Sequence, residues 1–144
     1  MRVVDIIDAK GTLAIRDRPT PSPGPEELLI QVAAAGVNRP DLLQRKGLYP
    51  PPPGASDILG LEVSGTVVAL GADVKSFSVG DAVCALVPGG GYAEYAVAHE
   101  GACLRKPNNL SFLEAATLPE VFFTVWSTLH DLGRIQVGER LLIH

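Results

Sequence analysis

The sequence predicts a mainly-β domain with a few short helices. The chain has 144 residues, of which 47% are hydrophobic and 19% charged, and this suits one folded domain with an apolar core. Its 15 glycines and 12 prolines divide it into short pieces, as expected of an all-β domain rich in turns. The apolar and β-branched runs between these turns are short enough to be strands.

The first third of the chain is expected to contain three strands. Residues 3–7 and 13–15 are short β-branched or apolar runs. Residues 27–35 are nearly continuously apolar and predict a buried strand. The alternating prolines of residues 19–25 lack backbone donors, which predicts a surface connector, although their Pro-x-x-Pro spacing would also suit a partner that reads polyproline II.

A short helix is predicted to begin at Asn38, which is a favourable N-cap residue. Pro40 lies in the first turn, where its missing donor costs little, and Asp41 complements the positive end of the helix dipole. The helix is expected to reach about Arg45 and to be ended by Gly47.

Three more strands are predicted in the middle of the chain, at residues 60–70, 82–87 and 92–98. The first has small or β-branched residues at the alternating positions Val63, Gly65, Val67 and Ala69, with glycine kinks as strands of barrels use where they bend.

Helical signals replace this pattern after residue 110. Capping-box spacing occurs at Ser111–Glu114 and again at Thr117–Glu120. Apolar residues then recur at helical spacing and predict a helix over about 118–132. Residues 141–144 predict a buried strand, which needs a sheet to join, so we expect the sequence to be a fragment of a longer protein.

Charge and composition exclude several classes of function. The net charge of -4 and the lack of a basic cluster argue against nucleic-acid binding. No uncharged apolar run approaches the roughly 20 residues of a membrane span, and Asp5 lies too early for a signal peptide. Cys84 and Cys103 form no paired motif and predict two reduced, buried thiols. We therefore expect a cytoplasmic protein.

Six stretches of the chain carry a further signal when taken together: residues 35–41, 45–50, 59–65, 79–81, 89–95 and 137–144. In this order and spacing they resemble the medium-chain dehydrogenase/reductase superfamily, and specifically its zinc-independent NADPH quinone oxidoreductase branch. The resemblance implies a GroES-like β-barrel over residues 1–115. It also implies that residues 116–144 are a connecting helix and the first strand of a Rossmann domain, and that this domain is truncated after that strand.

Relatives that hold a catalytic zinc have a cysteine and a histidine as ligands where this sequence has Asn38 and Leu61. Leucine cannot bind zinc and an amide is a poor ligand, so we expect no metal. Two cysteines also cannot build a four-cysteine structural zinc site. His99 and Cys103 could offer two ligands, but no third is near in sequence, and a surface histidine is the preferred interpretation.

The resemblance implies hydride transfer from NADPH to a quinone in a dry cleft. By this resemblance Asn38 and Tyr49 are catalytic residues and also contact the cofactor, together with Thr124. Each has a simpler alternative: a helix cap for Asn38, loop packing for Tyr49, and a bond to its own helix backbone for Thr124. Asp41, Arg45 and Glu62 are expected to form a structural ion-pair cluster, with a proton relay as the alternative.

Two other functions stay open at this point. One is a zinc-free enoyl-thioester reductase of the same superfamily, and the other is a non-catalytic GroES-like module. The residues that grip the adenosine half of NADPH in such proteins follow the strand predicted at 141–144, and Gly89–Gly91 does not replace them, because no helix follows it. We therefore expect the printed chain alone to be inactive, and the full-length protein to be a homodimer or a larger homo-oligomer.

Overall fold

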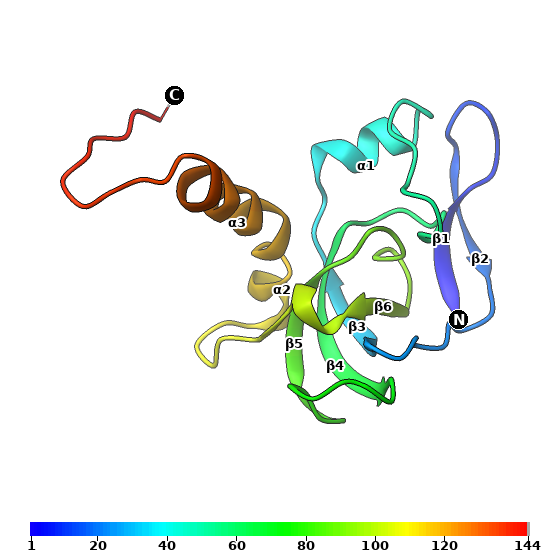
Figure 1. The fold of residues 1–144 in the computed structure, drawn as a ribbon. Helices are drawn as coiled ribbons and strands as arrows, with labels where there is room; N and C mark the ends of the chain where they lie inside the picture. The colour runs from blue at the N-terminus through cyan, green and yellow to red at the C-terminus, as the bar shows by residue number, and fades with distance from the viewer. Residues whose placement is uncertain (144) are drawn as a thin grey trace.

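A computed structural model describes residues 1–143 and confirms a mainly-β fold (Figure 1). Within these residues the strands are β1 (Arg2–Ile6), β2 (Leu13–Asp17), β3 (Glu27–Ala35), β4 (Glu62–Leu70), β5 (Ala82–Leu86), β6 (Tyr95–His99) and β7 (Cys103–Arg105). The helical segments are α1 (Arg39–Gln44), the 3-10 turn η1 (Glu100–Ala102), α2 (Phe112–Ala115), α3 (Pro119–Trp126) and η2 (Ser127–Leu132).

The strands form two antiparallel sheets that curl into a half-barrel (Figure 1). The larger sheet has the order β6-β3-β4-β5-β7, and β1 pairs with β2 alone. The small sheet is tied to the large one just before β6, because Val4 N donates to the Tyr92 carbonyl at 2.8 Å and Val3 bridges to Ala93. The backbone of Tyr92 is thereby held by Val4 on one side and by Leu59 on the other.

The hydrophobic core lies inside the larger sheet. Its fully or nearly buried members come from five strands and their ends, as the alternation of side chains in strands requires. They are Leu28, Ile30, Val63, Val67, Val83, Ala85, Val87, Ala96, Ala98 and Cys103.

Most of the predicted elements are confirmed, and two of the differences have clear causes. The predicted strand at 92–98 begins only at Tyr95, because the backbone of Tyr92 bonds to Leu59 and Val4 instead of continuing the ladder.

The capping box predicted at Thr117 and Glu120 is wrong. The Thr117 hydroxyl donates to the Glu114 carbonyl at 2.9 Å, and the N-cap of α3 is Leu118, whose side chain makes no cap.

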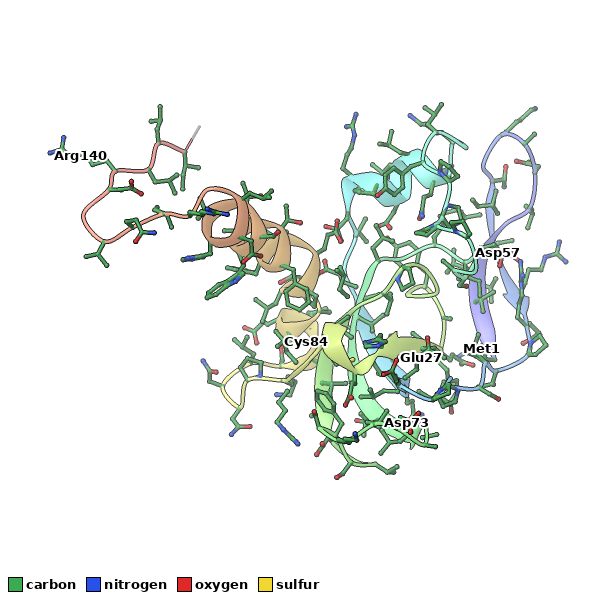
Figure 2. All side chains as sticks on the ribbon, viewed as in Figure 1. Met1, Glu27, Asp57, Asp73, Cys84 and Arg140 are labelled. Atoms are coloured by element: carbon green, nitrogen blue, oxygen red, sulfur yellow. The ribbon has the colours of Figure 1, made fainter. Side chains whose placement is uncertain are left out.

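The C-terminal part extends away from the half-barrel (Figure 1). The predicted helix over 118–132 is confirmed as α3 followed by η2, whose bonding is π-helical. The strand predicted at 141–144 is wrong for Leu141–Ile143, which form no strand. The cause is that within residues 1–143 no other strand lies beside them. His144 lies outside the described residues. Figure 2 places Arg140 on this extension and Cys84 in the body of the half-barrel. The domain boundary at residue 115 stays a prediction.

Candidate functional site

The candidate site forms around the first turn of α1. Asn38 is its N-cap in extended conformation, and Asp41 at the third helical position accepts the Asn38 backbone N–H at 2.7 Å. The predicted end is also confirmed, because Gly47 has φ of 69°, where glycine carries no steric penalty. Local capping therefore fixes the positions of Asn38 and Asp41 relative to each other in the first turn of α1.

Glu62, the first residue of β4, connects this turn to α3. Its side chain is buried, with the residue only 2% exposed. One carboxylate oxygen accepts from Asn38 Nδ2 at 2.8 Å, and the other accepts from the backbone N–H of Glu120 at 2.9 Å. A single carboxylate thus joins α1, β4 and the start of α3.

The same oxygen of Asp41, Oδ2, also accepts from a tyrosine in the loop before β6, while Oδ1 has no hydrogen-bond partner within residues 1–143. Tyr92 donates its hydroxyl to Asp41 at 2.8 Å, and Asp41 is 2% exposed. Burial, that hydrogen bond and the nearby charges of Asp41 and Glu62 raise the pKa of Tyr92 well above its usual value. Tyr92 therefore stays a neutral phenol and a permanent donor at physiological pH.

The predicted ion-pair cluster of Asp41, Arg45 and Glu62 is wrong in two respects. Arg45 does not belong to it, and among the described residues the two carboxylates are not held by ion pairs. Asp41 and Glu62 do lie close to the same turn, but Arg45 turns away and donates to the carbonyl of Gly11 in the β1–β2 loop. Within residues 1–143 no salt bridge reaches Asp41 or Glu62. The donors to the two carboxylates are neutral groups rather than a cation: two N–H groups of Asn38, the Tyr92 hydroxyl and the backbone N–H of Glu120.

The structure brings two of the three predicted cofactor residues onto connected elements. Asn38 is linked through Glu62 to α3, which carries Thr124 one turn further on. Thr124 donates its hydroxyl to the Glu120 carbonyl at 2.8 Å, which is the backbone bond considered as its simpler role, and leaves a lone pair free. Tyr49 lies apart on the loop after α1, with 47% of its surface exposed. Cofactor contacts by these three residues stay predictions.

A third carboxylate borders this network. The side chain of Glu120 is partly buried near Glu62 and Asp41, and desolvation followed by those two charges raises its pKa above the usual 4.5. A carboxyl group with a raised pKa holds its proton more tightly in the folded state than in the unfolded chain. Its contribution to stability is complete below pH 4.5 and is lost as the pH rises through the folded-state pKa.

Replacing Glu120 with glutamine is therefore expected to stabilise the protein more at pH 7 than at pH 4. The variant does not titrate, so it escapes the loss that the wild type suffers as Glu120 ionises. Urea unfolding of both proteins at the two pH values measures the difference. An equal difference at pH 4 and pH 7 would show that Glu120 does not feel its acidic neighbours.

The two residues considered as a second metal site are used locally. His99 ends β6 and accepts the Gly101 backbone N–H at 3.0 Å through Nδ1, while the Cys103 thiol points to the His99 carbonyl at 3.3 Å. No cluster of three or more histidine, cysteine or acidic side chains suited to a metal ion occurs in residues 1–143. At the positions of the zinc ligands of relatives, Leu61 is buried and apolar, and the Asn38 amide is bonded to Glu62. This donor set does not fit zinc.

Comparison with known proteins identifies the fold. The model of the alcohol dehydrogenase GroES-like domain matches residues 24–108. The chain belongs to this family. Its β half-barrel is thus the GroES-like domain that the sequence predicted, within the medium-chain dehydrogenase/reductase superfamily.

The relatives include reductases of two kinds. The trans-enoyl reductase RAP2 of Pyricularia oryzae is 43% identical over 126 residues, which are 81% of this chain and 35% of that protein. The solved quinone oxidoreductase from Coxiella burnetii superposes with a TM-score of 0.77 at 30% identity, over 96% of this chain and 45% of that one. Mycobacterial Rv1454c, solved in complex with NADPH, gives a TM-score of 0.80 at 32% identity, over 96% and 44%. The chain thus spans less than half the length of each of these relatives.

Two parts of the site were not found from the sequence. The Tyr92–Asp41 bond joins residues 51 positions apart, and the Glu62–Glu120 bond joins residues 58 apart. Tyr92 follows three glycines, and a Cβ on Gly60 would come within 2.6 Å of its ring. The glycines in these two segments were the only signal in the sequence that the segment of Gly60 lies close to the Tyr92 ring.

Proposed function

We propose that this chain is the GroES-like domain of an NADPH-dependent quinone reductase that transfers hydride without a metal. The observation that carries the proposal is that Leu61 is buried and apolar and that the Asn38 amide is bonded to Glu62, at the two positions where the resemblance implies zinc ligands. A site of this kind cannot polarise an alcohol or ketone by Lewis acidity. A quinone needs no such help, because it accepts hydride readily.

NADPH would supply the hydride, and the residues of this chain would orient the reacting rings. Tyr49 offers an exposed ring that can pack against a flat quinone or nicotinamide, and a hydroxyl that can donate a hydrogen bond. Asn38 keeps one amide hydrogen beyond the one it gives to Glu62, and Thr124 keeps an acceptor lone pair. These donors and acceptors suit a nicotinamide carboxamide or a quinone carbonyl. Hydride transfer would give the hydroquinone anion, and one proton from water would complete the hydroquinone.

Replacing Tyr49 with alanine in the full-length protein is expected to lower kcat/KM for quinones by about tenfold or more, because the ring that orients the substrate is lost. Initial rates of NADPH oxidation measure it. Tyr49→Phe is the matched control, since it keeps the ring and removes only the hydroxyl. Because Tyr49 lies on an exposed loop, both variants are expected to fold normally. An unchanged rate for Tyr49→Ala would show that Tyr49 only packs within its loop and does not orient the substrate.

An enoyl-thioester reductase is the second candidate, and the 43% identity with a trans-enoyl reductase favours it. Turnover of the full-length protein on a quinone and on a crotonyl thioester, each with NADPH, separates the two. Higher kcat/KM on the thioester would replace the first proposal. Turnover of neither would favour a non-catalytic module.

We also propose a cytoplasmic location and a homodimeric or larger assembly for the full-length protein. Both cysteines of the chain are free and buried, and burial raises the pKa of each thiol, which suits a reducing compartment. In the described part of the chain, no helix combines the length and the apolar character needed to cross a bilayer. The proposed partner is a small quinone, and nothing in the charge pattern suits nucleic acid.

A further inference from the structure

The buried carboxylate of Glu62 joins two distant parts of the chain through its hydrogen bonds. A buried carboxylate accepts hydrogen bonds and cannot donate them, so both of its oxygens need donors. Glu62 finds one donor 24 positions before it, Asn38 Nδ2, and one 58 positions after it, the N–H of Glu120. Gly36 makes room for it, since a Cβ there would lie 2.0 Å from Glu62 Oε1.

The first of these bonds sets the orientation of Asn38. An asparagine amide can present either its oxygen or its nitrogen to a neighbour, and the two ends differ in what they recognise. Facing an acceptor-only carboxylate at 2.8 Å, Asn38 must present Nδ2. The amide oxygen and the second N–H therefore keep fixed directions, which a freely turning side chain would not provide.

The second bond anchors α3. The N-cap residue of this helix, Leu118, makes no side-chain cap, so the first N–H groups of the helix, which have no partner inside it, need another acceptor. Glu62 supplies it from the sheet, and its negative charge is favourable at a helix N-terminus. The start of α3, and with it Thr124, is thus held at a fixed position relative to β4.

We propose that Glu62 is a positioning residue, which holds Asn38 and α3 in one arrangement so that the nicotinamide contacts on both elements keep their spacing. The inference rests on the proposed function for its consequence in catalysis. Glu62 itself is buried and bonded on both oxygens, so it acts through its two partners rather than by touching substrate.

Replacing Glu62 with glutamine in the full-length protein tests this. Glutamine has the same shape but one acceptor oxygen, so one of the two donors is left facing an amide nitrogen. We expect KM for NADPH to rise about tenfold, or 1.4 kcal/mol, with kcat changed less than about twofold. If Glu62→Gln does not fold, Glu62→Asp keeps the charge, cannot reach both partners, and is expected to raise KM in the same direction.

Glu120→Gln is the matched control. It removes a negative charge from the same neighbourhood but keeps the backbone N–H that bonds to Glu62. Its KM for NADPH is expected to stay within about twofold of the wild type. An equal rise in both variants would show that charge, not positioning, is responsible, and would overturn the inference.

A second readout does not depend on activity. In the wild-type protein the side-chain amide protons of Asn38 should give two well-separated NMR signals, one of them slow to exchange because it is bonded to Glu62. In Glu62→Gln, which has one acceptor oxygen for two donors, either this protection or that of the Glu120 backbone N–H should be lost, while in Glu120→Gln both should persist. If the wild type reduces no quinone, the proposed function fails, but these signals still test the positioning. Unchanged signals of both Asn38 and the Glu120 N–H in Glu62→Gln would overturn the inference.

Discussion

Replacing Gly65 with alanine is expected to lower the free energy of unfolding by about 3 kcal/mol or more. Gly65 lies in β4 opposite Val32 of β3, beside an irregularity in the register between Val32 and Ala34. A Cβ at this position would lie 2.0 Å from the carbonyl oxygen of Gln31. The obstacle is backbone in the centre of the sheet, so no side chain can rotate away to relieve it. β3 and β4, the longest pair in the fold, must separate.

Thermal unfolding measures the effect, and about 3 kcal/mol corresponds to a fall in Tm of roughly 6–12 °C for a domain of this size. Gly101→Ala is the matched control. Its Cβ would meet only the exposed ring of His99, at 3.2 Å, and its φ is not positive. Its Tm should change little. A Gly65→Ala protein as stable as the control would show that the sheet relaxes more easily than its bonding suggests.

Local signals in the sequence predicted the start and end of the helices well. Asn38 and Gly47 bound α1, and Ser111 with Glu114 forms the capping box of α2, because each of these bonds spans only a few residues. The same reasoning failed at Thr117. There, the acceptor for the first turn of α3 is Glu62, a residue from the sheet that local spacing cannot reveal. Sequence spacing predicts a cap only where no tertiary acceptor competes.

The candidate site was predictable only in part, for a related reason. The family resemblance placed the segments of Asp41 and Glu62 side by side, and the structure confirms this. It did not predict that Arg45 would bond to Gly11 instead, because the β1–β2 loop lies far away in sequence. The Tyr92–Asp41 bond has the same character. Which buried carboxylate meets which donor is decided by how strands and loops pack, and one sequence does not contain that information directly.

Gly36→Ala is expected to destabilise the protein by about 3 kcal/mol, through Glu62 rather than through the glycine itself. The new Cβ would lie 2.0 Å from Glu62 Oε1 and 2.6 Å from its Cδ. The carboxylate is buried and held by Asn38 and Glu120, so moving it breaks hydrogen bonds to a charged group, each of which contributes about 1.5–3 kcal/mol. Denaturant unfolding of the variant measures the loss.

A double-mutant cycle with Glu62→Gln decides whether the loss has this origin. Suppose that Gly36 acts by leaving space for the bridging carboxylate. The loss in the free energy of unfolding for Gly36→Ala/Glu62→Gln should then be smaller than the sum of the two single losses, by at least about 0.5 kcal/mol, since both changes break the same bonds. Strictly additive losses would mean that Gly36 is needed for its own backbone. Coupling would instead tie the glycine in the segment before α1, the carboxylate in β4 and the first turn of α3 into one unit, and the site would depend on a residue without a side chain.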